Sequence, residues 1–451
     1  MVFWIIAGLI SLAVLAAILL VFFLYACVEK EKRAATRSGL AVILVLALSL
    51  VFSSLPAPWR AGLFGAVFVV LSLVFIGLLL SGRPNKATEI IGPQERIDER
   101  DVIFARFDMG EATANFRDYY ARRPERRKID DEIRALPDIL APPHLKKSPT
   151  LFALAAAEFG FLEHQISRVA GKESSDKVES SPPENTRMVK SVLKYLGADA
   201  CGICLLNPAY IYSHGGRGPD PYGAKIDLRH AFAIVFALEM DTEMVAAAPA
   251  APVIVETGKK YVEAARISII AADLIRRLGF PARAHVAGSN YQAVLPPIAW
   301  EAGLGEVGRL GVLITWKYGP RARLGLITTG LPLVADRPEH RGVLDFCEKC
   351  RKCALLCPAQ AIPRGDRIEE NGSRRWILDR EACYKYWRKA GTDCAVCLHV
   401  CPYSKPSGLL HDAIRRAGSR WRLFQTISAW GDDVFYGKNP IRKKSRTSLS
   451  S

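Results

Sequence analysis

The chain has 451 residues, half of them hydrophobic, and a formal net charge of +16. This length allows two soluble domains with further segments, and the hydrophobic fraction allows a large core. The Lys and Arg residues are scattered along the sequence, so a solvated surface that also meets anionic lipid explains the charge better than nucleic-acid binding does. We therefore expect no nucleic-acid partner.

Three apolar stretches open the chain. No charged side chain lies in residues 1–28, 38–59 or 61–82, and each stretch is long enough to cross about 30 Å of hydrocarbon as a helix. The first stretch lacks the basic start of a cleaved signal peptide, and its apolar core is too long for one. Residues 1–83 are predicted to form a three-helix transmembrane anchor in the lipid bilayer.

The charges beside these stretches predict the orientation of the anchor. The loop between the first two stretches is basic, with Lys30, Lys32, Arg33 and Arg37. The loop between the second and third offers only Arg60. By the positive-inside rule, the first loop and the rest of the chain lie on the cytoplasmic side of a multi-pass membrane protein.

Residues 84–185 are charged and interrupted by proline, and they are interpreted as a connector and the N-terminal part of the soluble region. Within them, residues 171–185 are polar and are expected to form a surface loop. From residue 186 to 343 the pattern changes to alternating helices and strands. The expected elements are a helix at 188–197, strands at 198–206 and 230–241, a helix at 260–279 and a strand at 280–288. Cys201 and Cys204 are three residues apart on a strand, so they point to opposite faces and are interpreted as core residues.

Eight of the eleven cysteines lie between residues 344 and 405. The first four, Cys347, Cys350, Cys353 and Cys357, have the spacing C-x-x-C-x-x-C-x-x-x-C and are followed by proline. The second four are Cys383, Cys394, Cys397 and Cys401, again followed by proline. This is the pattern of a ferredoxin domain with two 4Fe–4S clusters, in which the fourth cysteine of a run binds the other cluster.

This rule assigns the ligands of both clusters. The first cluster takes Cys347, Cys350, Cys353 and Cys401, and the second takes Cys357, Cys383, Cys394 and Cys397. Ten residues separate Cys383 from Cys394 where a ferredoxin has two, which we interpret as a longer loop that keeps the ligand. Zinc ribbons and disulfides are the alternatives, but zinc favours two separated C-x-x-C pairs and disulfides would not need this triplet spacing twice.

Several motifs occur in order before and within the cysteine region: LGADACGI, EMD, AGLGEVGRLGVLITWKYGPRAR, TTGLPLVADRP and FCEKCRKCALLCP. Together they resemble the catalytic subunits of reductive dehalogenases, over roughly residues 186–405. The resemblance implies an α/β fold in which a nitroreductase-like core binds cobalamin or a related corrinoid beside the ferredoxin-like domain.

The resemblance also implies catalytic residues. Tyr261, in GKKYVEAA, matches the family's proton donor, which opens the helix ending in Leu-Gly. Arg323, in YGPRAR, matches a supporting arginine, and Asn290 matches an asparagine in the loop after the following strand. A guanidinium beside a phenol favours the phenolate and so eases proton release. The alternatives are a packed aromatic at a helix start for Tyr261 and a surface salt bridge for Arg323.

The sequence AGLGEVGR has two interpretations. Gly303 and Gly305 permit close backbone approach, which suits a bulky cofactor or its nucleotide tail. Glu306 and Arg309 could instead form an ion pair that holds the loop, so cofactor-binding and structural roles both stay open.

The implied function is reductive dehalogenation of an organohalide, with electrons passing from an unidentified donor through the two clusters to cobalt. Unlike typical respiratory members, this sequence shows its own anchor and no twin-arginine pair near its start. One alternative is a corrinoid enzyme similar to epoxyqueuosine reductase; another is a non-catalytic, membrane-tethered electron carrier. The remaining residues, 406–451, form a C-terminal extension whose aromatic stretch is expected either on the core or at the membrane surface.

Overall fold

The structure is a computed structural model that describes residues 1–439 apart from 147, 219–220 and 289–290. The chain divides into two compact units. The first unit contains Met1–Lys86, Arg341–Cys350 and the described C-terminal residues from Ser407. The second contains Ala87–His340 and Arg351–Pro406. The first unit therefore combines three segments that are distant in the sequence.

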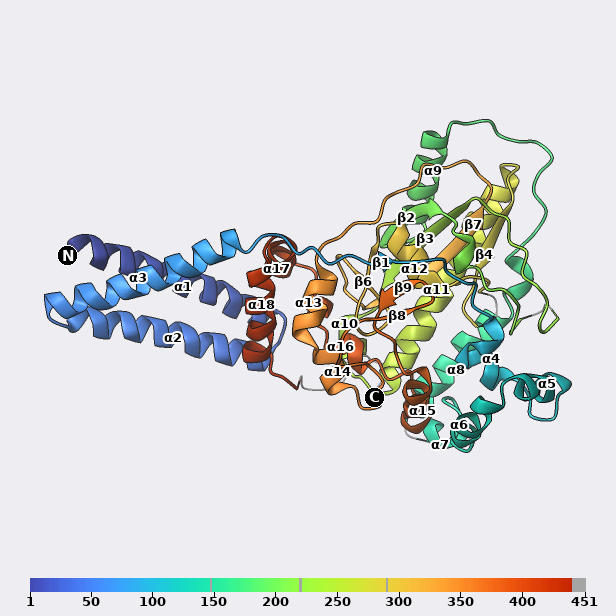
Figure 1. Ribbon diagram of the computed structural model, residues 1–451, viewed down its shortest axis with the longest axis horizontal. Coiled ribbons are helices and arrows are strands. Elements are labelled where there is room, and N and C mark those ends of the chain that lie inside the picture. Colours follow the sequence, from blue (N-terminus) through green and yellow to red (C-terminus); the bar gives the residue numbers. More distant parts are fainter. Residues whose placement is uncertain (147, 219–220, 289–290, 440–451) are drawn as a thin grey trace. The chain divides into compact units, whose positions relative to one another are not determined.

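Three long apolar helices form most of the first unit (Figure 1). They are α1 (Val2–Val28), α2 (Lys32–Ser54) and α3 (Ala57–Leu80). By length and composition each of the three can cross a membrane, which confirms the apolar helices of the predicted anchor. Helices α2 and α3 begin before the uncharged stretches at 38–59 and 61–82, because helical hydrogen bonding continues through the charged turns beside an apolar stretch. Gly8 lets α1 approach the backbone of Phe64 on α3, as small residues do in membrane bundles.

Three shorter helices complete the first unit: α13 (Val343–Cys350), α17 (Leu409–Arg420) and α18 (Arg422–Phe435). Helix α18 contacts α13 and α17, and it also contacts the apolar helices α2 and α3. The C-terminal extension is therefore part of the same unit as the anchor. The basic end of the chain, 440–451, lies outside the described residues.

A four-stranded antiparallel sheet forms the centre of the second unit. Its spatial order is β2 (Ala200–Leu205), β3 (Phe232–Glu239), β7 (Ala322–Thr329) and β4 (Ala282–His285). Strand β3 is apolar from Phe232 to Leu238, FAIVFAL, because helices cover both faces of the sheet and bury both sets of side chains. The strands expected at 198–206, 230–241 and 280–288 are confirmed.

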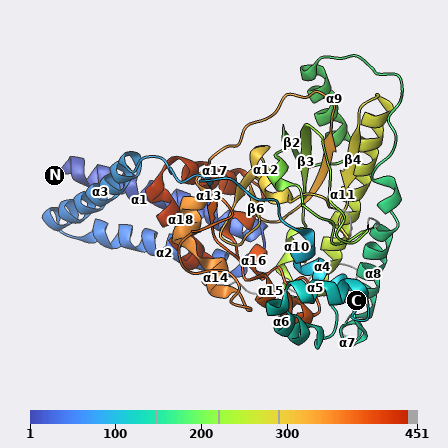
Figure 2. The same cartoon turned by 45° about the vertical axis from the view of Figure 1, so that its right-hand side comes forward.

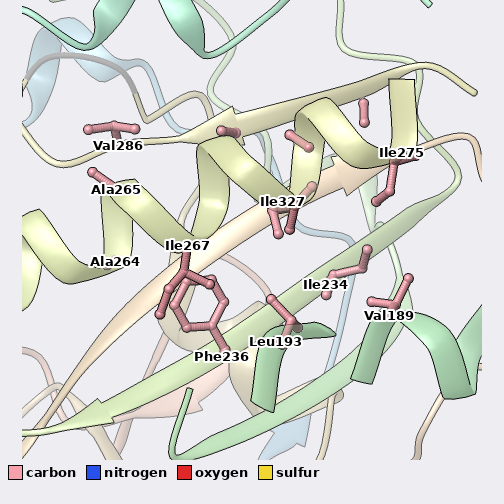
Figure 3. Close-up of a cluster of buried hydrophobic side chains, with 14 of the residues drawn as sticks. Val189, Leu193, Ile234, Phe236, Ala264, Ala265, Ile267, Ile275, Val286 and Ile327 are labelled. Atoms are coloured by element: carbon pink, nitrogen blue, oxygen red, sulfur yellow. The ribbon is translucent and has the colours of Figure 1, made fainter. Parts of the chain in front are cut away.

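The two faces of this sheet carry separate hydrophobic clusters. On one face, Ile234 and Phe236 pack against α9 (Pro182–Tyr195) and α11 (Ala251–Arg277), as Figure 3 shows. On the other face, Ala233 and Val235 pack against α12 (Leu295–Glu301). Neighbouring residues on a strand point to opposite faces, so the sheet is the middle layer between helices.

The expected helices are present but begin earlier than predicted. Helix α9 begins at Pro182, inside the segment expected to be a surface loop, because the Glu184 carboxylate accepts a hydrogen bond from the Ser181 backbone N–H at 2.9 Å. Helix α11 begins at Ala251 rather than near Lys260. Its first turn contains Pro252, which a helix tolerates where the backbone N–H has no helical partner.

The charged segment before the sheet is folded rather than extended. Its helices are α4 (Ile103–Asp108), α5 (Ala114–Arg122), α6 (Pro124–Arg134), α7 (Pro142–Leu145) and α8 (Pro149–Glu163). Helix α8 packs along α11, and α6 contacts α15 (Arg380–Ala390) of the cysteine region. Figure 2 shows this group of helices beside α11 and α15.

The cysteine region of the second unit contains short helices and a small sheet. Its helices are α14 (Lys352–Leu356), α15 and α16 (Val396–His399), and α10 (Thr242–Ala246) packs against α16. Strand β9 (Ser373–Arg375) pairs with β1 (Glu89–Ile90) on one side and with β8 (Ile368–Glu370) on the other, and β5 (Gly305–Val307) pairs with β6 (Leu313–Thr315). The loop expected between Cys383 and Cys394 is mostly helix α15, which contradicts that prediction.

Candidate functional site

Four thiols gather at one place in the second unit. They come from four separate segments: Cys357 ends α14, Cys383 lies in α15, Cys394 follows that helix, and Cys397 lies in α16. Burial raises the pKa of Cys383 to about 12 and that of Cys394 to about 11, and the neighbouring thiols of the group oppose ionisation further. The pKa of Cys397 is raised well above its ordinary value by burial and by the other three.

These four are the cysteines assigned to the second cluster. All eleven cysteines of the chain carry thiols rather than disulfides. In the part of the chain that the structure describes, no trio of His, Cys, Asp or Glu stands ready to hold a single metal ion. A 4Fe–4S cluster differs from a single ion because each thiolate binds its own iron, and the positive irons offset the cost of four buried thiolates. The donor set therefore fits a cluster.

The two cysteine runs adopt matching local geometry. Arg351, after Cys350, and Ala395, after Cys394, both have left-handed backbones, with φ of 52° and 54°. Each of these residues precedes a short helix, α14 or α16, and the two helices pack together. Non-glycine residues adopt this conformation rarely, and it is often found at functional sites.

Of the four cysteines assigned to the first cluster, Cys353 and Cys401 are buried in the second unit. Cys353 also lies near enough to Cys397 to raise its pKa. Cys347 and Cys350 lie on α13, in the first unit. The ligand set of the first cluster stays a prediction from the cysteine spacing.

Tyr261 lies on the long helix α11 beside the sheet. Because α11 begins at Ala251, Tyr261 stands in the helix interior, almost three turns from the start, and does not open the helix as expected. Its ring is partly buried against the sheet cluster and lies 6.5 Å from the ring of Phe159 on α8.

Arg323 on β7 links Tyr261 to the turn that carries Cys394. Its guanidinium carbon lies 5.3 Å from the centre of the Tyr261 ring. Its Nη2 donates hydrogen bonds to Asp393 Oδ2 at 2.7 Å and to Thr257 Oγ1 at 2.6 Å. Thr257 Oγ1 in turn donates to the same Asp393 oxygen at 2.6 Å, so three side chains hold one another. Arg323 does form a salt bridge, but this salt bridge does not lie at the surface, because the Asp393 side chain is only 7% exposed.

The positive charge of Arg323 is stabilised by its neighbours. Burial alone lowers the pKa of Arg323, but Tyr261 and Asp393 nearby raise it above its ordinary value. Arg323 Nε is also buried and makes no hydrogen bond to any described residue. A buried donor without a protein acceptor is one that a bound molecule can use.

Tyr212 and Tyr291 extend this group of side chains. Both are partly buried, and burial raises the pKa of Tyr212 to about 12 and also raises that of Tyr291. Tyr291 lies near Tyr261 and Arg323, whose charges also act on it. Both tyrosines keep part of their surface accessible, as Arg323 and Cys397 do.

The remaining predicted residues do not join this group. Asn290 lies outside the described residues. A Cβ on Gly303, whose φ is +76°, would lie 2.7 Å from the Arg337 carbonyl oxygen, and one on Gly305 would collide with the Ile314 carbonyl. Close packing against neighbouring carbonyl groups is therefore enough to explain why glycine occupies both positions. The contact of these glycines with a cofactor stays a prediction.

Glu306 and Arg309 are both buried. Arg309 Nη1 donates to the carbonyl oxygens of Pro363 and Gly365 at 2.8 and 2.7 Å, and its guanidinium lies 4.4 Å from the Trp376 ring. Arg309 thus ties the loop after β5 to the segment between the two cysteine runs. This favours the structural interpretation of the loop, and cofactor binding by Glu306 and Arg309 stays a prediction.

Two residues of the site were missed from the sequence. Asp393 directly precedes Cys394, but nothing in the motif shows that it pairs with an arginine 70 positions earlier. Thr257 lies four residues before Tyr261, on the same face of a helix. That spacing would have indicated Thr257 if the helix had been predicted to begin at Ala251. Cys201 and Cys204 do lie on opposite faces of β2, as expected.

The fold and the thiol groups define an iron–sulfur protein. A family model described as a 4Fe-4S dicluster domain matches residues 346–405, which include all eight cysteines of the two runs. These residues therefore form a domain for two 4Fe–4S clusters.

The relatives of the chain are reductive dehalogenases. Tetrachloroethene reductive dehalogenase of Dehalobacter restrictus is 31% identical over 313 residues, 59% of this chain and 56% of that protein. The enzyme of the same name from Sulfurospirillum multivorans is 30% identical over 293 residues, 57% of this chain and 58% of that protein. Epoxyqueuosine reductase of Lactococcus garvieae matches only 24% of this chain, at 33% identity over 119 residues. The chain is thus a homologue of the reductive dehalogenases and spans little more than half the length of these relatives.

Solved structures agree on the fold. The catabolic reductive dehalogenase NpRdhA superposes with a TM-score of 0.65 at 24% identity, covering 79% of this chain and 49% of that chain. A further reductive dehalogenase structure, described as suggesting a mechanism for B12-dependent dehalogenation, superposes with a TM-score of 0.64. The chain therefore shares a mixed α/β fold with these enzymes over most of its length.

Proposed function

We propose that this chain is a membrane-anchored, corrinoid-dependent reductase that replaces the halogen of an organohalide with hydrogen. The observation that carries the proposal is the Arg323 guanidinium, which lies over the Tyr261 ring and is paired with Asp393, beside the second group of thiols. A charged group and a phenol thereby lie next to the turn that carries Cys394, a proposed ligand of an electron-carrying cluster. This arrangement suits a reaction that consumes two electrons and one proton and releases halide.

The corrinoid is proposed to bind beside Tyr212, Tyr291 and Arg323, in a nitroreductase-like core. The buried Arg323 Nε offers a hydrogen bond that no described residue accepts, which fits a bound polar group. When bound, the corrinoid would supply a cobalt ion that the clusters can reduce and whose reduced form can cleave the carbon–halogen bond. Gly303, Gly305, Glu306 and Arg309 are proposed to shape the loop beside it.

The protein's own residues supply and control the proton. Tyr261 is proposed to donate its phenolic proton to the carbon that loses halide. The positive charge of Arg323 stabilises the phenolate that remains, which lowers the cost of the transfer. Asp393 and Thr257 hold that guanidinium in place, so they act as positioning residues. Asn290 is proposed as a further contact to the reacting group.

The membrane orientation is also a proposal. The basic loop before α2 supports placement of that loop, and with it the soluble part of the chain, on the cytoplasmic side. The electron donor would then be a cytoplasmic or membrane-bound reductant.

The test uses the full chain, purified anaerobically in detergent, reconstituted with iron and sulfide and loaded with cobalamin. Halide release from a panel of chlorinated and brominated alkenes and phenols is measured with a low-potential chemical reductant. We expect release from at least one compound and loss of most of that rate in Tyr261→Phe. Corrinoid binding without any halide release would contradict the dehalogenase assignment, and a failure to bind corrinoid would leave the electron-carrier alternative.

A further inference from the structure

Helix α18 crosses the ends of the apolar helices within the first unit (Figures 1 and 2). Its first turn reaches α3, where a methyl group added to Gly77 would be in van der Waals contact with Leu423. Its last turn reaches α1, where the rings of Phe22 and Phe435 lie 4.8 Å apart. A helix that crosses the ends of membrane-spanning helices runs along the membrane surface.

Two arginines near the start of α2 hold the C-terminal end of α18. Arg37, in the first turns of α2, donates a hydrogen bond to the Val434 carbonyl oxygen, and Arg33 donates to the Asn439 carbonyl at 2.9 Å. Cations at the C-terminal end of a helix satisfy its last carbonyl groups and interact well with its dipole. The helix is therefore held at the basic ends of the three apolar helices.

The two faces of α18 have different surroundings. Leu423, Ile427, Trp430 and Val434 follow the spacing of one helical face. Gln425 lies on the opposite face, fully buried, and donates to the carbonyl oxygens of Gly342 at 2.8 Å and of Gly418 at 3.1 Å. The apolar face thus turns away from α13 and α17 and includes the residue that contacts α3.

The middle of that apolar face is open. Trp430 is 65% exposed and Ile427 is 36% exposed, between the ends that touch the anchor. The described residues 407–439 also carry five Lys or Arg and three Asp or Glu. Arg416, Arg420 and Arg422 among them are exposed. An exposed tryptophan, an apolar face and basic residues are the features of a helix that lies in the membrane interface.

We propose that α18 is such an interfacial helix, with Ile427 and Trp430 inserted at the level of the lipid headgroups and Arg416, Arg420 and Arg422 bound to anionic lipid phosphates. The lipid surface is the favoured partner because the open face continues the apolar surface of α3. The charge of the segment is also complementary to anionic lipid. The proposal rests on the anchor alone, so it holds whether or not the chain is a dehalogenase.

Fluorescence quenching by brominated lipid tests the insertion. The full chain, with Trp4 and Trp59 of the anchor both replaced by phenylalanine, is reconstituted in nanodiscs that contain lipid brominated near the headgroup. We expect strong quenching that is largely lost on further Trp430→Phe replacement and kept on the control replacement Trp387→Phe, in the second unit. Equal quenching in these two variants overturns the insertion.

Native mass spectrometry tests the lipid selectivity. Complexes with phosphatidylglycerol and with phosphatidylcholine are compared for the parent chain, for Arg416, Arg420 and Arg422 all changed to Gln, and for a control with Gln at the exposed Arg229 and Arg277. We expect fewer phosphatidylglycerol adducts only in the first variant. Unchanged adducts overturn the lipid site. A dimer that Trp430→Glu converts to monomer, together with absent quenching, would show that the face binds a second copy of the chain instead.

Discussion

At the scale of single residues, Arg323 joins two parts of the chain for which different steps are proposed. Its guanidinium contacts the Tyr261 ring on one side and forms a buried ion pair with Asp393 on the other. Because Asp393 directly precedes Cys394, the position of the guanidinium beside the proposed proton donor depends on the turn that holds a proposed cluster ligand. The same turn, at Asp393 and Cys394, would therefore position both a cluster ligand and the guanidinium beside Tyr261.

Changing Asp393 to Asn should separate these roles. The loss of the ion pair frees the guanidinium to turn away from Tyr261, so we expect kcat for halide release to fall about tenfold, a change of about 1.4 kcal/mol in the barrier, with little change in KM. Asp393→Glu should restore part of the rate. Iron content, which should stay unchanged, is measured on the same samples. A variant with full iron and full kcat would contradict the positioning role.

The cysteine assignment predicts a specific iron count. Replacing Cys357 with Ser removes a ligand of the second cluster, so the iron bound per chain should fall from about eight toward about four. Cys201→Ser, on strand β2, is the control and should keep all the iron, because this cysteine packs beside the sheet cluster. Iron assay and electron paramagnetic resonance of the reduced proteins measure both. Loss of iron in both variants would show unfolding rather than loss of a ligand.

At the scale of elements, helices α8 and α11 meet at a pair of acidic side chains. Burial, and then the nearby Glu256, raises the pKa of Glu158 on α8 to about 7. The folded chain therefore holds a proton that the unfolded chain releases between about pH 4.5 and 7, and stability falls as the pH rises through that window. The carboxylate present above pH 7 weakens the contact between these helices.

Glu158→Gln should consequently stabilise the chain at pH 8 and have little effect at pH 5. Glu158 is only partly buried, so solvent screening limits the gain to about 1 kcal/mol, a rise of about 2–4 °C in the midpoint of thermal unfolding. The exposed Glu163→Gln on the same helix is the matched control. Circular dichroism melts at the two pH values measure the effect, and a gain of the same size at both would contradict a pKa origin.

The elements also show what the sequence could predict. The apolar helices, the strands and the cysteine runs follow from strong local patterns, and Tyr261 and Arg323 follow from the resemblance to a family. The start of α11 was missed because its Ala- and Pro-rich beginning resembles a loop, although proline suits the first helical turn. Helix α15 was missed because only its caps reveal it: Asp379 accepts from the Ala382 backbone N–H at 2.9 Å, and Gly391 ends the helix with φ of 76°.

Local sequence patterns could not predict the contacts between residues that are distant in the chain. The pairing of Arg323 with Asp393 joins residues that are 70 positions apart, and no local signal selects Asp393 among the acidic residues of the cysteine region. The place of α18 depends on helices that begin some 400 residues earlier. Both contacts follow from tertiary packing, which a single sequence does not encode in any local period.

At the scale of the whole molecule, the chain combines three helices that can span a membrane with an iron–sulfur domain, so the side of the membrane on which that domain lies would decide which reductants can reach the clusters. Lys30, Lys32 and Arg33 lie at or beside the start of α2, whereas the turn between α2 and α3 has no charged residue before Arg60. The positive-inside rule counts Lys and Arg in short loops of this kind. The first loop should therefore stay in the cytoplasm, and the three spans then leave everything after α3 on that same side.

Two reporter fusions test this orientation in cells. Alkaline phosphatase, which is active only when exported, is fused after Ser54, in the turn between α2 and α3, or after Ser451. We expect activity only from the first fusion, and fluorescence from a fluorescent protein fused after Ser451. Replacing Lys30, Lys32 and Arg33 with Gln should weaken the preference, because these charges oppose translocation of the loop. Phosphatase activity from the fusion after Ser451 would place the redox unit outside the cytoplasm and require an exported electron donor.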